Sequence, residues 1–270
     1  MGKIPVENIY AMIVTLLTSC LFPIILWIIL AQKRKRLSGT VIAGVMGFVL
    51  FQMIIRIPLL QLLAKNQRWL SFFENNIMLA IVILALSAAL FETAGRLLVL
   101  KGILRNRLSF NAALGAGLGH GGAESVGIVG LTYVNNLIFS FLINTGMLPS
   151  LEGAEEIQYA LMNTPASVFF AAGVERVLAI AFHIALSVLL CYFIMKGRTL
   201  LGSALCIGTH FAFDIAVSLT AKNEWPVWAI EGVIAAVAVA AVLLVIRLKS
   251  LFSIEEIPKD SAETAVEQGY

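Results

Sequence analysis

The sequence predicts an all-α membrane protein, a polytopic bundle of about seven transmembrane helices. Hydrophobic residues make up 60% of the 270 residues and charged residues only 13%, whereas soluble domains are about 45–50% apolar and 25% charged. Apolar stretches long enough to cross a bilayer, about 20 residues, recur along the whole chain. They cover residues 8–30, 39–63, 76–100, 108–147, 165–195, 199–221 and 226–248.

These segments are expected to form a single transmembrane bundle over residues 1–252, followed by a polar tail at 253–270 that is predicted to be disordered. The segment between 149 and 164 is the one sizeable outer loop, and a short surface helix is expected within it. The chain is therefore predicted to be an integral membrane protein whose first partner is the lipid bilayer.

The basic residues of the loops predict the orientation of the bundle. Eleven lie in one set of alternate loops and four in the other. Because cytoplasmic loops carry the excess of lysine and arginine, the N-terminus is predicted outside and the C-terminus inside. The net charge of +3 is spread over these loops, and it is too small to indicate a nucleic-acid partner. The eleven are Lys33, Arg34, Lys35, Arg36, Lys101, Arg105, Arg107, Lys196, Arg198, Arg247 and Lys249.

The segment 108–147 is too long for one straight crossing. A straight helix of that length would measure about 60 Å, twice the hydrocarbon thickness. Its ends are predicted on opposite sides, so we expect one tilted or broken crossing with the break at its glycines. The glycines of Gly115–Glu124 also pair as G-x-x-x-G, which favours close helix packing. The same run matches G-x-G-x-x-G, but a dinucleotide site needs a soluble strand–turn–helix unit that is missing here.

Ionisable residues inside membrane spans are energetically costly, so each one is a functional candidate. All three histidines of the chain are among them. At about 1.5 Å per residue, six of the side chains fall at similar depths and are predicted to share one layer near the bilayer middle. These six are Glu92, His120, Glu124, His183, His210 and Asp214. The other ionisable residues of the spans are Arg56, Arg96, Glu175, Arg176 and Glu231.

Spacing supports the convergence of these groups. Three pairs stand four residues apart and therefore share a helix face: Glu92 with Arg96, His120 with Glu124, and His210 with Asp214. Neutral imidazoles beside carboxylates can bind a divalent metal or position a water for general-base catalysis.

Structural explanations compete for several of these side chains. The structural alternative for Arg96 is a buried ion pair that only neutralises Glu92, and for His183 it is an interhelical hydrogen bond. Glu175 is predicted near the outer rim of its helix, and Arg56, close to Pro58, is predicted to extend its head group towards the membrane surface.

The motifs in this set resemble those of the YhfC-type intramembrane protease family. This family is a branch of the superfamily that contains the CAAX-prenyl endopeptidases and bacteriocin-processing enzymes. The resemblance covers the predicted catalytic core, about residues 76–221. It rests on Phe91-Glu-Thr-Ala-Gly-Arg96, Gly119-His-Gly-Gly-Ala-Glu124, Glu175-Arg176 with His183, and His210-x-x-x-Asp214.

Two positions depart from the superfamily pattern of E-E-x-x-x-R, F-x-x-x-H and H-x-x-x-N/D. Phe91 replaces the first glutamate, and Ala179 stands four residues before His183. The water-activating carboxylate is therefore open between Glu92 and Glu124.

The resemblance implies hydrolysis of peptide bonds in or near the bilayer, with a membrane protein or a lipidated peptide as substrate and a bacterial plasma membrane as the location. Glu92 or Glu124 would take a proton from water. His120 and His183 would orient that water or bind zinc or another divalent metal, and His210, held by Asp214, would stabilise the oxyanion or complete the metal site. Arg96 would keep Glu92 ionised, and a metal-independent glutamate mechanism stays open. The alternatives are a proton-coupled transporter or channel, and a non-catalytic scaffold of the same superfamily.

Overall fold

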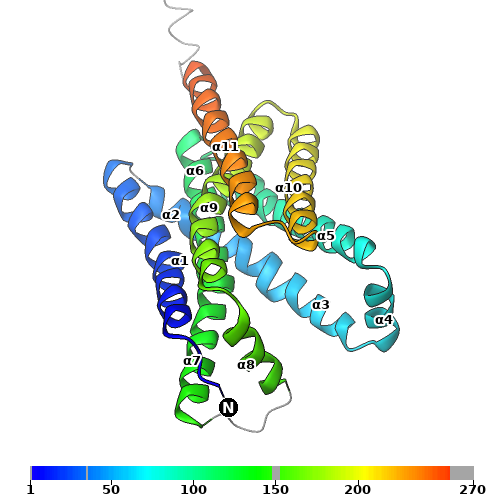
Figure 1. Cartoon of the computed structure of the whole chain (residues 1–270). Helices are drawn as coiled ribbons and strands as arrows, with labels where there is room; N and C mark the ends of the chain where they lie inside the picture. Colours follow the sequence, from blue (N-terminus) through cyan, green and yellow to red (C-terminus); the bar gives the residue numbers. More distant parts are fainter. Residues whose placement is uncertain (1, 35, 148–152, 256–270) are drawn as a thin grey trace, which may run out of the picture.

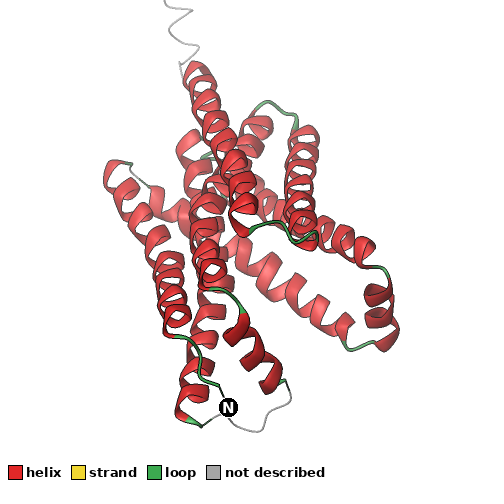
Figure 2. Cartoon of the chain, in the orientation of Figure 1, coloured by secondary structure: helices red, strands yellow, loops and turns green. Residues whose placement is uncertain are grey.

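The computed structural model describes residues 2–34, 36–147 and 153–255, and within these ranges every regular element is helical (Figure 2). In the part of the chain that the structure describes, seven helical stretches are long and apolar enough to cross a membrane, which confirms the predicted number of spans. They run Val6–Lys33, Leu37–Ala64, Ile77–Ile103, Phe110–Thr145, Ala166–Met195, Thr199–Lys222 and Val227–Phe252.

Several spans are composite. The α-helices are α1 (Val6–Lys33), α2 (Leu37–Phe48), α3 (Ile57–Ala64), α4 (Gln67–Asn75), α5 (Ile77–Leu97), α6 (Phe110–Glu124), α7 (Leu131–Thr145), α8 (Ala154–Asn163), α9 (Ala166–Met195), α10 (Thr199–Lys222) and α11 (Val227–Glu255). Three π-helical segments interrupt them: η1 (Val49–Arg56), η2 (Leu98–Ile103) and η3 (Ser125–Gly130).

Helix α9 lies at the centre of the bundle, where it packs against α1, α6, α10 and α11 (Figure 1). Helix α2 lies on the other side of α6, and α5 pairs with α10. The N-terminal end lies beside α7 and α8 at the bottom of the view, whereas α11 ends at the top. The two ends of the described chain therefore lie at opposite ends of the bundle, as an odd number of spans requires. The assignment of the outer and inner sides stays a prediction.

The helix α8 confirms the short surface helix predicted after the fourth span. Helix α11 continues to Glu255, so the first three residues of the predicted tail are helical. The rest of that tail, 256–270, lies outside the described residues.

The expected break at the glycines of the fourth span is wrong. Helix α6 runs unbroken through Gly115 to Gly122, and the irregular part is η3, which begins one residue after Glu124. The packing role of the glycines is confirmed. A methyl group on Gly119 would stand 1.9 Å from the Val41 carbonyl oxygen of α2, and one on Gly117 would stand 2.5 Å from the Ile184 Cα of α9. The two G-x-x-x-G pairs thus let α6 approach two different helices.

Candidate active site

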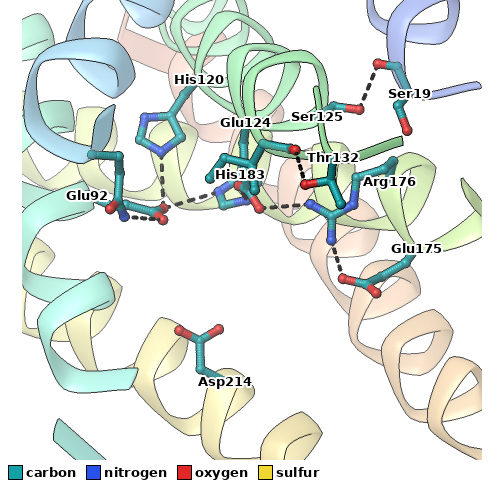
Figure 3. A network of polar contacts seen from close by, with 12 residues as sticks. Ser19, Glu92, His120, Glu124, Ser125, Thr132, Glu175, Arg176, His183 and Asp214 are labelled. Atoms are coloured by element: carbon teal, nitrogen blue, oxygen red, sulfur yellow. Dashed lines mark hydrogen bonds and ion pairs between the residues drawn. The ribbon is translucent and has the colours of Figure 1, made fainter. Parts of the chain in front are cut away.

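A cluster of ionisable side chains lies between the helices of the bundle, and Figure 3 shows its polar contacts from close by. Four helices supply it. Helix α5 carries Glu92 and Arg96, α6 carries His120 and Glu124, α9 carries Glu175, Arg176 and His183, and α10 carries His210 and Asp214. The close approach of α6 to both α2 and α9 places His120 in the interior, where only 2% of the residue is exposed.

Glu92 is the centre of this cluster. Its Oε2 atom lies 3.0 Å from His120 Nε2, 3.5 Å from His210 Nδ1 and 3.7 Å from His183 Nδ1. Arg96 Nη2 donates to the same oxygen at 3.3 Å. A buried carboxylate needs such partners because its desolvation is otherwise costly. All three histidines of the protein therefore meet at one carboxylate oxygen.

The other oxygen of Glu92 has a partner that sequence reasoning missed. Gln52 Nε2 donates to Glu92 Oε1 at 2.7 Å, and Gln52 is buried. Gln52 lies on η1, outside the predicted core of 76–221. The signal that could have found it is an amide in the middle of the apolar segment 39–63, where a buried polar group requires a hydrogen-bond partner.

His183 connects the two carboxylates that the sequence left as alternatives. Arg96 Nη2 lies 2.6 Å from His183 Nδ1, and His183 Nε2 lies 2.5 Å from Glu124 Oε2. Arginine only donates hydrogen bonds, so Nδ1 must be the acceptor and the proton of a neutral imidazole must be on Nε2. That proton therefore lies beside the Glu124 carboxylate.

The second carboxylate, Glu124, is also held from the α9 side. Arg176 Nη1 donates to Glu124 Oε1 at 2.8 Å, and Arg176 makes a second, very short contact with Glu175. Glu175 has a side chain exposed by 34%, in keeping with a position near the rim. A chain of contacts thus runs from Glu92 through His183, Glu124 and Arg176 to Glu175 (Figure 3).

Asp214 is less tightly bound to the cluster. Its Oδ2 lies 3.5 Å from His210 Nε2, and Figure 3 shows it apart from the chain of contacts. His210 Nδ1 makes no hydrogen bond. The Phe182 ring packs edge-on against His210 at 5.8 Å between centroids, which supports the imidazole from one side. The ring is positioned, but it is not locked by a short hydrogen bond.

A cavity of about 330 Å³ adjoins this cluster. Glu124, His183, His210 and Asp214 are among the residues that line it, but Glu92 and His120 are not. The side chain of Glu124 is 18% exposed and that of Glu92 only 6%. A molecule in the cavity would therefore meet Glu124 and His183 first, while Glu92 lies behind them.

The π-helical segments coincide with these residues. Gln52 lies within η1, η2 begins two residues after Arg96, and η3 begins directly after Glu124. Single π-helical turns inside α-helices occur frequently at functional sites, because the extra residue changes the direction of the side chains around it. Their coincidence with three of the interacting side chains supports a functional role for the cluster.

The prediction for Arg56 is wrong. Its guanidinium does not extend to the membrane surface but donates to Ser87 Oγ at 3.0 Å and to the Leu84 carbonyl oxygen at 2.9 Å, both on α5. It also donates to Gln52 Oε1 at 3.2 Å and lines the cavity. The cause is the turn of η1, which places Gln52 and Arg56 on the side of the span that faces α5.

Comparison with known families agrees with the motifs. The model of the YhfC intramembrane metalloprotease family matches residues 18–247. The chain belongs to this family. It is also similar to "Uncharacterized membrane protein YhfC" of Bacillus subtilis (strain 168), with 30% identity over 175 residues, which cover 62% of this chain and 67% of the relative. No solved structure matches the chain. This YhfC-family chain is an integral membrane protein, and a bacterial plasma membrane is consistent with the Bacillus relative.

The YhfC family name implies a metal, and the donor set fits one. Glu92, His120 and His183 each offer one ligand atom, and these atoms lie within 4.8 Å of one another. Two imidazoles and one carboxylate form a known ligand set of catalytic zinc sites. Arg96 Nη2 contacts the same Glu92 oxygen and the same His183 nitrogen, however. A divalent metal therefore fits here when the Arg96 donor moves away from those two atoms.

Proposed function

We propose that this protein is an intramembrane endopeptidase that uses Glu124 as the general base. One observation carries the proposal. Glu124 and His183 contact each other at 2.5 Å on the wall of a cavity that lies inside the membrane-spanning bundle. A carboxylate and an imidazole beside a space that can hold water are the groups needed to activate that water for attack on a carbonyl.

Hydrolysis would begin when a water molecule attacks the carbonyl carbon of the scissile bond. Its proton passes to Glu124, whose carboxylate faces the cavity. His183 Nε2 lies 2.5 Å from Oε2 of this carboxylate and limits its movement during this step. Arg176 holds the other oxygen of Glu124 and fixes the direction of the carboxylate.

The tetrahedral intermediate needs a hydrogen-bond donor for its oxyanion and a proton for the leaving amine. We assign the first role to His210, which lines the cavity and is directed by Asp214. Glu124 then returns its proton to the amine nitrogen as the C–N bond breaks. The products are a carboxylic acid and an amine, so the base is regenerated.

Glu92 acts as the organising carboxylate rather than the base in this proposal. It holds three imidazoles at one oxygen, and Arg96 contacts the same oxygen. A divalent metal held by Glu92, His120 and His183 would polarise the scissile carbonyl and bind the attacking water. Phe91, in the place of the family's first glutamate, leaves Glu124 as the second carboxylate of the site.

The lining of the cavity supports a substrate with an apolar part. Apolar side chains from α5 and α10, among them Ile81, Leu84 and Phe213, line it beside the polar groups. A membrane protein segment or a lipidated peptide suits such a lining, because the apolar part of the substrate replaces lipid contacts.

The test is cleavage of membrane-protein reporters by the full chain reconstituted in liposomes, with products identified by mass spectrometry. We expect cleavage by the wild type, and loss of cleavage in single substitutions of Glu92, Glu124, His183 and His210. Full cleavage by all four variants, each shown to be folded, would refute the mechanism.

A proton-coupled carrier is the second candidate. The chain of contacts from Glu92 to Glu175 favours it, since chains of carboxylates and histidines also build proton relays. Proton flux across the same liposomes without any cleavage would support the carrier and exclude the protease.

A further inference from the structure

Arg56 differs from the other two arginines that lie at the cluster. Arg96 contacts Glu92, and Arg176 contacts Glu124 and Glu175, so each pairs with a carboxylate. The three partners of Arg56 are all neutral: the Ser87 hydroxyl, the Leu84 carbonyl and the Gln52 amide oxygen. Among the described residues no carboxylate lies within ion-pair distance of Arg56, although Glu92 and Asp214 influence it from further away.

The carboxylates on the cavity wall are already engaged. Glu124 and Glu175 contact Arg176, and Asp214 contacts His210. A guanidinium carries five N–H donors, and the contacts of Arg56 use three of them. The side chain is partly exposed at the cavity, so it can accept a further partner there.

A cation without a carboxylate partner is costly inside a membrane span, and it is usually a functional feature. We infer that Arg56 recognises an anionic group of the bound substrate, an acidic side chain or a C-terminal carboxylate of the peptide that is cut. This inference rests on the proposed function and adds a specificity-determining residue to it. Arginine suits the role because its planar fork of donors matches a carboxylate.

Arg56 lines the same cavity as Glu124 and His183, so the anionic group is expected in the space that also holds the reacting bond. Arg56 Nη1 donates to Gln52 Oε1, and Gln52 Nε2 donates to Glu92 Oε1, so a single amide side chain separates the cation from the organising carboxylate. Because Arg56 and Glu124 line one cavity, the acidic residue is expected close in sequence to the bond that is cut.

The cavity has room for such a segment. Its volume of about 330 Å³ lies at the lower end of ordinary ligand sites, about 300–1,000 Å³. Leu84 and Phe213 line the same space, and they would contact the apolar side chains next to the anionic group.

The experiment measures binding of three fluorescent apolar peptides to the full chain in detergent, in a Glu124→Gln background that prevents cleavage. One peptide is amidated and has no acidic residue, one is amidated with a single Asp, and one has a free C-terminal carboxylate. We expect at least one acidic peptide to bind roughly 10- to 100-fold more tightly than the neutral one, the range of one charge-assisted hydrogen bond. The acidic peptide that gains affinity identifies the source of the anionic group.

Arg56→Gln is expected to remove this preference by lowering the affinity for the acidic peptide alone. Arg56→Lys is expected to keep part of the preference. Arg68→Gln removes the same charge at an exposed position on α4 and should leave all three affinities unchanged. If Arg56→Gln lowers the affinity for all three peptides equally, Arg56 only holds η1 against α5, and the inference is overturned. Equal affinities of the three peptides for the Glu124→Gln protein would also overturn it, and this comparison does not need the Arg56 variants to fold.

Cleavage of the neutral peptide by the wild type is measured in parallel and separates the two proposals. Cleavage without any acidic preference in binding would refute the role of Arg56 and leave the protease intact. An acidic preference without cleavage of any peptide would support the role of Arg56 and refute the protease.

Discussion

Replacing Glu124 by glutamine tests whether the carboxylate on the cavity wall is the base. Glutamine keeps the shape and can still accept the hydrogen bond from Arg176, but it cannot take a proton from water. Loss of a general base lowers the rate by about 10²–10⁴-fold, which corresponds to roughly 3–5 kcal/mol at 1.36 kcal/mol per tenfold. The same change should alter stability little, because Arg176 keeps its second carboxylate partner, Glu175.

Glu92→Gln should differ from Glu124→Gln in its effect on stability. It leaves Arg96, only 2% exposed, without a carboxylate partner. Removing one partner of a buried ion pair costs about 3–5 kcal/mol. We therefore expect Glu92→Gln to lower the melting temperature in detergent clearly, whereas Glu124→Gln keeps the wild-type melting temperature and loses cleavage.

The assay is the initial rate of reporter cleavage in liposomes, beside the melting temperature of each variant. Glu175→Gln is the matched control, since it removes the other carboxylate of Arg176 and should retain cleavage. If Glu124→Gln cleaves at more than about a tenth of the wild-type rate, Glu124 is not the general base. A loss of only about 10- to 100-fold accompanied by a lower metal content would instead make Glu124 the group that orients a metal-bound His183.

Three further predictions concern packing, charge and metal. Gly119→Ala should lower the melting temperature by the equivalent of about 1–3 kcal/mol, because the new methyl group would stand 1.9 Å from the Val41 carbonyl oxygen. Gly208→Ala, where no atom lies within 4 Å of the added methyl, should be neutral or stabilising, and equal effects of the two would refute the packing argument. Arg96→Gln should be destabilised by about 3–5 kcal/mol, because the buried Glu92 carboxylate loses its arginine partner. It also removes the cation that competes for the metal ligands. Added zinc should therefore raise the melting temperature of Arg96→Gln more than that of the wild type; zinc at 100 times its dissociation constant stabilises a protein by about 2.7 kcal/mol. Chelation should release a divalent ion from purified wild-type protein, measured by elemental analysis, and the absence of any ion in protein purified without chelator would refute the metal assignment.

The hydropathy pattern of the sequence was sufficient to predict most of the fold. The apolar segments identified all seven spans, because a bilayer imposes the same length on every crossing. The rarity of ionisable residues in spans likewise singled out the residues that meet in the site, since lipid tolerates so few of them without a structural or functional reason. The shared depth of Glu92 and the three histidines followed from helix rise alone, and their contacts agree with it.

Tertiary structure decided what each residue faces. Two details of the helices could not be predicted from the hydropathy pattern. These are the π-helical turns and the direction that η1 gives to the side chains of Gln52 and Arg56. These depend on the rotation of each helix against its neighbours, which hydropathy does not specify. The distinction between the two carboxylates arose in the same way. Only the packing of α5, α6 and α9 leaves Glu124 on the cavity wall and places Glu92 behind it.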